Sequence, residues 1–173
     1  MTTLTYYIAA SLDGFIAHDD GSFGGFSWDD EVVSDFLADL GSFGTVLMGR
    51  KTYEVGLREG KTSPYPAMRQ VVFSRTMQKS PDEAVEIVGG EIVEFVQLLK
   101  AKVDKPIWLC GGAEVASALM GAGLVDSVVV KLNPVLFGSG IPLFHDVVDQ
   151  TALELKATKV YDCGVVLLRY AVT

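Results

Sequence analysis

The sequence predicts an α/β domain with a central mixed, mostly parallel sheet that ends in an antiparallel hairpin. Two observations predict it. Between residues 4 and 132, short β-rich apolar runs alternate with segments of helical periodicity, the pattern of parallel strands joined by crossover helices. After residue 150, two alternating segments follow each other across a short turn, the pattern of a hairpin. A length of 173 residues fits one domain over residues 1–173.

The first third of the chain predicts a strand, a long loop and a helix. Leu4–Ala10 reads as a buried strand, and residues 11–29 form a loop that contains four glycines. A loop of this length in a compact domain is usually functional. Asp29 or Asp30 caps a helix that ends at Gly41. Its expected inward side chains are Val32, Val33, Phe36, Leu37 and Leu40.

The middle of the chain predicts four more strands, three helices and a proline-containing loop over residues 58–68. The expected strands are Thr45–Met48, Gln70–Ser74, Ala84–Val88 and Pro106–Cys110. The expected helices run from Gly49 to about Leu57, over Glu91–Lys102, and from the Gly111-Gly112 pair to about Met120.

The last third predicts one further parallel strand and the hairpin. The strand is Asp126–Leu132, and residues 133–144 form a glycine-containing loop. Thr151–Val160 and Val165–Val172 are the two hairpin strands, with a turn near residues 162–164.

Charge is distributed unevenly along the chain. Residues 1–49 carry eight acidic residues and no Lys or Arg, whereas residues 50–79 carry seven basic residues and two acidic ones. The net charge of −8 argues against nucleic acid as a partner, because phosphates require a basic face. A single basic segment in an acidic chain predicts a small anionic ligand. The alternative is a solvated charged surface.

Several classes of protein are disfavoured by what the sequence lacks. No apolar run approaches the roughly 18 residues of a membrane helix, so no membrane partner is expected. The first residues have no basic region ahead of their apolar ones, so we expect no signal peptide and a cytoplasmic location. His18, His145, Cys110 and Cys163 share no metal-ligand spacing, and no metal site is expected.

The first candidate site is a strand end followed by two cations. Gly49 closes the strand, and Arg50 and Lys51 begin the next helix. Positive charge at a helix N-terminus opposes the macrodipole and costs about 0.3–1 kcal/mol. A bound anion reverses this effect, because backbone N–H groups and the guanidinium then face it. The alternative is a pair of solvated cations that contact Glu54 or the acidic first third of the chain.

Two more strand ends have the features of anion sites. Ser74 and Arg75 end one strand, and this pair can bind a phosphate or carboxylate. Gly111 and Gly112 lie between a strand and a helix, where glycines allow a diphosphate to approach the backbone. The G-x-G-x-x-G spacing is missing, which disfavours a doubly wound dehydrogenase. Three such strand ends together indicate a dinucleotide, although each one alone also fits a structural role.

The same segments carry a family resemblance. Ala9-Ala10 with Ile16, the run GRKTYE at 49–54, FSR ending at 75, and GGAE at 111–114 resemble dihydrofolate reductase. The runs SLDGFIA at 11–17 and NPVLFGSGIPLF at 133–144 more closely resemble the riboflavin-biosynthesis reductases, the branch of the RibD C-terminal domain. The resemblance covers nearly the whole chain and implies a dihydrofolate reductase-like three-layer fold.

The resemblance implies NADPH as cofactor and a role for each matching residue. Cofactor phosphates are expected at Gly49, Arg50 and Thr52, and the adenosine 2′-phosphate at Ser74 and Arg75. The pyrophosphate is expected at Gly111, Gly112, Ala113 and Glu114, with a cis bond between the two glycines. The nicotinamide is expected beside Ala10 and Ile16. Substrate-side residues are Asp13, Trp28 and the turn from Leu136 to Gly138.

One departure from the folate reductases bears on the substrate. In those enzymes an acid about five residues after the tryptophan binds the pterin, and the residue five after Trp28 is Val33. The nearby acids, Asp29, Asp30 and Glu31, also suit a helix N-terminus whatever the function. Folate reduction is therefore disfavoured by the sequence.

The resulting hypothesis is an NADPH-dependent reductase that transfers hydride to a small heterocyclic, imine or carbonyl substrate, similar to 5-amino-6-(5-phosphoribosylamino)uracil reductase. The alternatives are a dihydrofolate reductase and a non-catalytic nucleotide-binding protein on the same scaffold. The proton donor stays open between Asp13, Asp30 and a water molecule. The branch resemblance also implies a homodimer.

Overall fold

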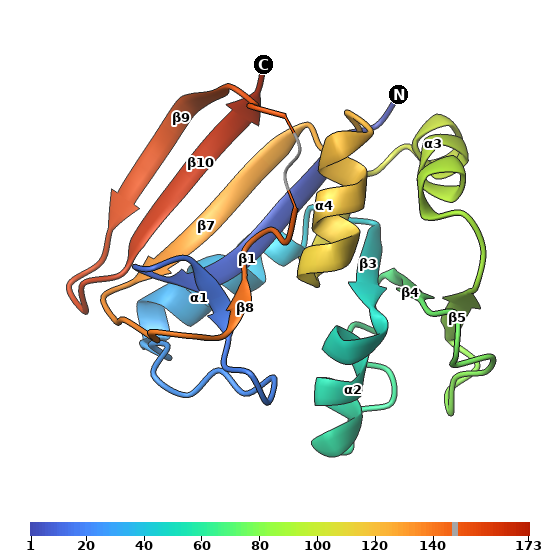
Figure 1. Ribbon diagram of the computed structural model, residues 1–173, viewed down its shortest axis with the longest axis horizontal. Coiled ribbons are helices and arrows are strands. Elements are labelled where there is room, and N and C mark those ends of the chain that lie inside the picture. The colour runs from blue at the N-terminus through green and yellow to red at the C-terminus, as the bar shows by residue number, and fades with distance from the viewer. Residues whose placement is uncertain (147–148) are drawn as a thin grey trace.

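The computed structural model describes residues 1–146 and 149–173. Its centre is an eight-stranded sheet in the order β5-β4-β3-β6-β1-β7-β10-β9 (Figure 1). The strands from β5 to β7 are parallel, and β10 runs antiparallel to both β7 and β9. The predicted fold class is confirmed. The strands of this sheet are β1 (Leu4–Ser11), β3 (Thr45–Gly49), β4 (Arg69–Phe73), β5 (Val85–Val88), β6 (Ile107–Gly111), β7 (Ser127–Asn133), β9 (Leu153–Val160) and β10 (Val166–Val172).

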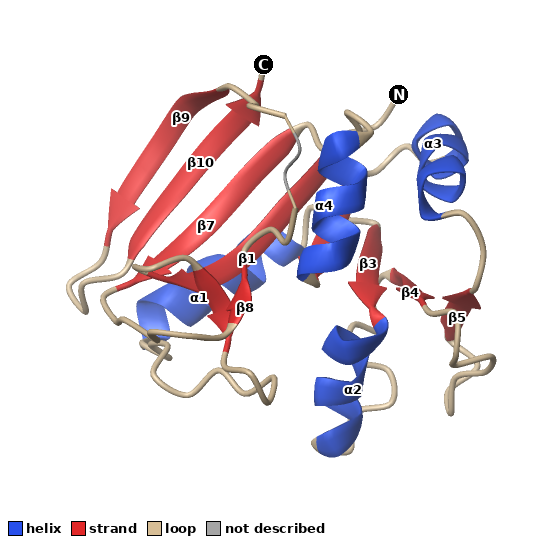
Figure 2. Cartoon of the chain, in the orientation of Figure 1, coloured by secondary structure: helices blue, strands red, loops and turns tan. Residues whose placement is uncertain are grey.

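In the described part of the chain, four helices pack against the two faces of this sheet and complete three layers (Figure 2). Helices α3 (Ile92–Lys102) and α4 (Ala113–Gly121) bury one face in a core that includes Leu4, Leu47 and Leu109. Helix α1 (Asp30–Leu40) buries the other face, and Tyr53 of α2 (Arg50–Arg58) joins that core. The long apolar runs of β1, β3 and β6 are explained by this double coverage. No helix in the described part of the chain is long and apolar enough to cross a membrane.

Two expectations about individual elements were wrong. The loops at residues 11–29 and 133–144 contain short strands, β2 (Phe15–Ala17) and β8 (Ile141–Pro142), which pair with each other. Their runs are too short to show a period in the sequence. Leu37, expected to face inward, is 61% exposed, because Val32, Phe36 and Leu40 complete the inward stripe of α1. Strand β9 is confirmed as a hairpin strand, and as the edge strand of the sheet it is exposed along its whole length.

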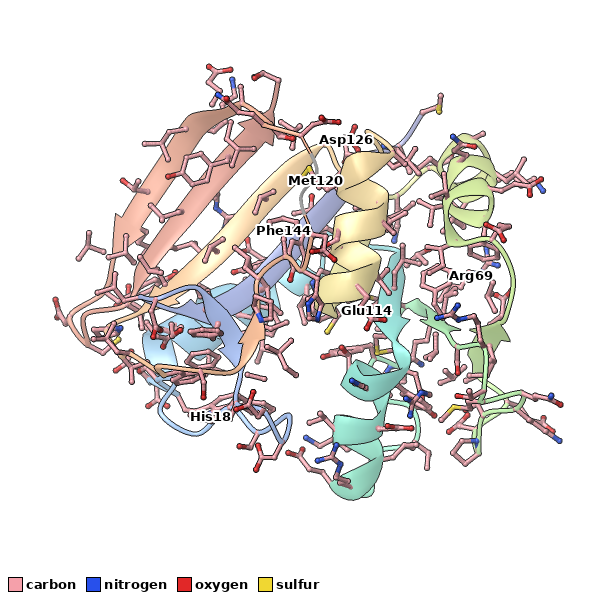
Figure 3. The ribbon with its side chains drawn as sticks, in the orientation of Figure 1. His18, Arg69, Glu114, Met120, Asp126 and Phe144 are labelled. Carbon is pink, nitrogen blue, oxygen red and sulfur yellow. The ribbon has the colours of Figure 1, made fainter. Side chains whose placement is uncertain are left out.

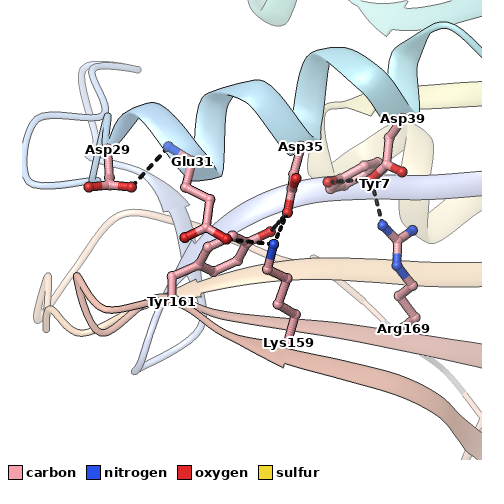
Figure 4. A network of polar contacts seen from close by, with 8 residues as sticks. All are labelled: Tyr7, Asp29, Glu31, Asp35, Asp39, Lys159, Tyr161 and Arg169. Atoms are coloured by element: carbon pink, nitrogen blue, oxygen red, sulfur yellow. Dashed lines mark hydrogen bonds and ion pairs between the residues drawn. The ribbon is translucent and has the colours of Figure 1, made fainter.

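A network of polar contacts joins α1 to strands β1, β9 and β10 (Figure 4). Lys159 of β9 forms ion pairs with Glu31 and Asp35 of the helix, at 2.8 and 2.6 Å. One turn later, Asp39 accepts hydrogen bonds from Tyr7 Oη of β1 and from the Arg169 guanidinium of β10. Asp29 is the N-cap of α1, and its carboxylate accepts a hydrogen bond from the Glu31 amide. Asp29 is one of the two residues that the sequence predicted as the cap.

Candidate functional site

The predicted anion-binding segments meet at one edge of the sheet. Strands β4, β3 and β6 are consecutive and parallel, so their carboxyl ends lie side by side although they are far apart in sequence. Strands β3 and β6 end at Gly49 and Gly111, and Ser74 directly follows β4. The same edge continues through β1 and β7, whose carboxyl ends carry the predicted substrate-side loops. Ligands of parallel α/β sheets bind outside this edge.

Two helix N-termini without side-chain caps meet there. Gly49 is the N-cap of α2 and Gly112 is the N-cap of α4, and neither helix has a side-chain hydrogen bond at its cap. A Cβ atom on Gly49 would lie 3.2 Å from the Gly112 backbone nitrogen, so the two turns are in contact. First-turn N–H groups point out of a helix without intrahelical acceptors. Two such sets side by side fit a pyrophosphate.

The glycine pair takes a conformation that other residues rarely adopt. Gly111 has φ +147°, and a Cβ atom there would lie 3.3 Å from Thr52 Oγ1. The bond between Gly111 and Gly112 is cis, as the resemblance implied. Ala113 is buried behind the pair, whereas Glu114 is exposed in the first turn of α4 (Figure 3). Thr52 is therefore the side chain next to the predicted pyrophosphate position.

The arginines and the serine at this edge differ in the contacts that their side chains make. Arg50 Nη1 forms an ion pair with Glu54 Oε1 at 2.7 Å, which is the alternative contact that the sequence left open. Ser74 Oγ accepts the amides of Thr76 and Met77 and shapes the turn after β4. Arg75 is exposed and forms no ion pair with the described residues. Their roles toward phosphate stay predictions.

The predicted nicotinamide and substrate residues lie at the ends of β1 and β7. Ala10 is buried near the end of β1, and Ile16 is half-buried in β2. Asp13 accepts hydrogen bonds from Ser11 Oγ and from the amides of Phe137 and Gly138. The Ser11 hydroxyl and then these two amides lower the Asp13 pKa to about 2. Asp13 thus ties the two loops together as a carboxylate, and an acid of that pKa is a poor proton donor near neutral pH.

Aromatic side chains hold the same two loops against each other. The ring of Phe137 stacks on His18 at 3.9 Å and on Phe26 at 5.0 Å between centroids. Trp28 is 69% exposed beside Phe23, and Leu136 is 67% exposed. Phe26 is therefore occupied within the protein, whereas Trp28 and Leu136 present free apolar surface at the predicted substrate side.

Two surface hollows lie away from this edge. They have volumes of about 240 and 250 Å³ and lie between α1 and the β9–β10 hairpin. The charged side chains that line them are paired: Asp35 with Lys159, Asp39 with Arg169, and Lys156 with Glu154. Backbone donors and loop ends define the candidate site better than these shallow hollows. Among the described residues, no cluster of three His, Cys, Asp or Glu side chains can hold a metal ion.

Lys131 on β7 is a residue that the sequence reasoning missed. It is half-buried, and its Nζ lies 3.7 Å from the centre of the Phe36 ring of α1. The one signal in the sequence was a lysine that interrupts the apolar run of a strand, VVVKL. Lysine is mostly exposed in proteins and almost never fully buried unless it is paired.

Replacing Gly49 with alanine tests the contact between the two helix N-termini. The added Cβ atom would press on the Gly112 nitrogen at 3.2 Å, and backbone is a neighbour that cannot move aside. We expect the free energy of unfolding to fall by about 1–3 kcal/mol, the range of overpacking, and nucleotide binding to weaken. Gly121→Ala is the matched control, because nothing lies within 4 Å of its Cβ position. Equal stability of the two variants in urea denaturation would contradict the contact.

Comparisons with known proteins bear on the family and the fold. The family model of the RibD C-terminal domain matches residues 2–167. The uncharacterized protein YwjB of Bacillus subtilis (strain 168) is 36% identical over 168 residues, which cover 93% of each protein. A protein of Shewanella sp. PV-4 named for riboflavin biosynthesis has a TM-score of 0.86 and 25% identity, covering 100% of this chain and 99% of that one.

A dihydrofolate reductase from Enterococcus faecalis, complexed with NADP(H), shares the fold at lower similarity. Its TM-score is 0.74 and its identity 20%, over 99% of this chain and 96% of that one. The resemblance stated from the sequence is confirmed at the level of family and fold.

Proposed function

Because the chain belongs to the family of the RibD C-terminal domain, we propose that it is an NADPH-dependent reductase. In this proposal it transfers hydride to a small heterocyclic, imine or carbonyl substrate, similar to 5-amino-6-(5-phosphoribosylamino)uracil in riboflavin biosynthesis. One observation carries the proposal. Three strand ends suited to anions lie side by side at one sheet edge, where two helix N-termini without side-chain caps touch. The identity with YwjB supports the family and leaves the substrate to experiment.

Different residues at this edge bind the pyrophosphate, the 2′-phosphate and the nicotinamide of the cofactor. Backbone N–H groups after Gly49 and Gly112 hold the pyrophosphate, and Arg75 holds the adenosine 2′-phosphate. Ala10 and Ile16 exclude water from the nicotinamide side. Bound NADPH supplies the hydride, and the protein supplies orientation and electrostatics. The substrate lies at the ends of β1 and β7, under the exposed face of Trp28.

Calorimetric titration with NADPH and NADH tests the cofactor. The wild-type protein is expected to bind NADPH at least tenfold more tightly than NADH, because only NADPH carries the 2′-phosphate. Arg75→Ala is expected to weaken NADPH binding by roughly 10- to 100-fold, the effect of losing one or two charge-assisted hydrogen bonds at about 1.4 kcal/mol per tenfold, and to leave NADH unchanged.

Lys102→Ala is the matched control, because it removes a positive charge from the exposed end of α3. It should leave both affinities within twofold. Saturable binding of neither nucleotide would rule out the reductase proposal. Tight NADPH binding without oxidation by 5-amino-6-(5-phosphoribosylamino)uracil, dihydrofolate or an aldehyde would favour a non-catalytic nucleotide-binding protein. Oxidation by dihydrofolate alone would make it a folate reductase.

We also propose a cytoplasmic homodimer, as the resemblance implied. Strand β9 supports this proposal, because its eight residues are all exposed at the edge of the sheet. The exposed fraction there is 44% for Leu153, 52% for Leu155 and 73% for Val160. An exposed edge strand presents unpaired backbone N–H and C=O groups that can pair with another chain.

A further inference from the structure

Lys131 is a cation held by aromatic rings on a covered face of the sheet. Its strand neighbours are Ala9 on β1 and Leu167 on β10, which offer no charge. The ammonium lies 3.7 Å from the centre of the Phe36 ring and 5.8 Å from that of Tyr7. Within residues 1–146 and 149–173 it forms no ion pair or hydrogen bond. Lys100, which is buried, is by contrast paired with Asp126.

The position of Lys131 links the two halves of the candidate site. It lies two residues before Asn133, whose Oδ1 accepts the Ser27 amide and so holds the loop that carries Trp28. Its partner across the strands, Ala9, directly precedes Ala10, the predicted neighbour of the nicotinamide. Lys131 and Asn133 are two residues apart on one strand, so their side chains lie on the same face of the sheet.

Burial also brings the pKa of the Lys131 amine close to neutral pH. Removal from water lowers the Lys131 pKa to about 8, far below its ordinary value. A general acid works best when its pKa lies near the working pH. The carboxylate of Asp13, by contrast, stays ionised at neutral pH because three hydrogen bonds lower its pKa to about 2.

We propose that the Lys131 ammonium is the proton donor of the reduction, an assignment that rests on the proposed reductase function. Lys131 gives one proton from Nζ to the nitrogen or oxygen of a C=N or C=O bond, while the carbon of that bond receives the hydride supplied by NADPH. The double bond becomes CH–NH or CH–OH, and the neutral lysine regains its proton from solvent. The positive charge also favours the negative charge that develops on the nitrogen or oxygen.

The cysteine and tyrosines around Lys131 have pKa values well above 8, and the nearby carboxylate and guanidinium form an ion pair. Burial raises the Cys110 pKa to about 11, and it raises the pKa values of Tyr7 and Tyr65 well above the ordinary tyrosine value. Asp39 of α1 and Arg169 of β10 are paired with each other. A decline in kcat as the pH rises through about 8 is therefore the expected signature of Lys131 losing its proton.

The activity test compares Lys131→Met with Lys102→Met, using 5-amino-6-(5-phosphoribosylamino)uracil, dihydrofolate and an aromatic aldehyde as substrates with NADPH. Methionine keeps the apolar contact with Phe36 and removes the proton. We expect Lys131→Met to lower kcat by roughly 10²- to 10⁴-fold, the usual contribution of a general acid, and to abolish the decline above pH 8. NADPH affinity measured by calorimetry stays within twofold. Lys102→Met, at the exposed end of α3, changes neither kcat nor the pH profile.

A second readout needs no turnover. Reductive methylation with ¹³C-formaldehyde followed by NMR titration reports the pKa of each lysine amine, and Lys131→Met assigns the Lys131 signal. A signal that titrates near pH 8 and shifts on addition of NADPH is expected. Titration near 10.5, or turnover in Lys131→Met within twofold of wild type, overturns the role of Lys131 alone. A wild-type protein that fails to bind NADPH or to reduce any of the three substrates overturns the proposed function, and the assignment with it.

Discussion

Replacing Trp108 with alanine is expected to lower the free energy of unfolding by about 3–5 kcal/mol, the usual cost of removing a buried aromatic side chain. Trp108 is 1% exposed in the middle of β6. Its ring contacts Phe36, Phe43 and Tyr65 edge-on or tilted, and its Nε1 donates to the Tyr7 carbonyl at 3.0 Å. The cavity would also loosen Phe36, which supports Lys131.

The other tryptophan is the matched control. Trp28 is 69% exposed, so Trp28→Ala is expected to change stability by at most about 0.5 kcal/mol. Because Trp28 lies on the predicted substrate side, its loss should reduce turnover while the fold persists. Urea denaturation followed by circular dichroism measures both stabilities. Similar losses in the two variants would mean that Trp108 does not anchor the α1 face.

Replacing Asp126 with alanine is expected to cost about 3 kcal/mol, the lower end of the range for breaking a buried ion pair, because Asp126 itself is 41% exposed. Lys100 is 5% exposed, and its Nζ donates to Asp126 Oδ2 at 2.6 Å and to the Leu124 carbonyl at 2.8 Å. The same oxygen of Asp126 accepts the Leu4 amide at 2.6 Å. The variant leaves the buried Lys100 ammonium without its counter-charge, and the Leu4 amide of β1 without its acceptor.

A double variant separates charge from packing. Lys100→Met combined with Asp126→Ala is expected to regain about half or more of the lost stability, since the uncompensated charge is gone. Asp104→Ala, at an exposed position before β6, is the control for removing an acid from an acidic protein. Thermal unfolding of the four proteins makes the comparison. A double variant less stable than Asp126→Ala would show that Lys100 stabilises by packing rather than by pairing.

The regular elements of this protein could be predicted because their signals are local. Buried parallel strands such as β1 and β3 are continuous apolar runs, and Gly41 and Gly49 mark the end of one helix and the start of another. The expected bounds differ from the structure by one or two residues, as for β4, which ends at Phe73 rather than Ser74. Two-residue β8 has no period to detect, and the exposure of β9 depends on the absence of a covering helix among the described residues.

The candidate site was predicted in pieces. Each strand end, at Gly49, Ser74 and Gly111, carried a local reason to bind an anion. Their meeting at one edge follows from the order β4-β3-β6, which no local pattern reveals. Asp13 was predicted as a substrate-side residue and candidate acid, and the structure engages it with Ser11 and the loop after β7.

What the sequence by itself determined is the family, the fold class and the chemical types available at each strand end, because periodicity, glycine positions and charge are properties of short segments. Only the tertiary structure decided which of those residues meet. The burial of Lys131, and with it a pKa near 8, depends on α1 crossing above β7 and placing Phe36 on the ammonium. Desolvation is a sum over everything that surrounds a group, so it exists only once distant segments are folded together.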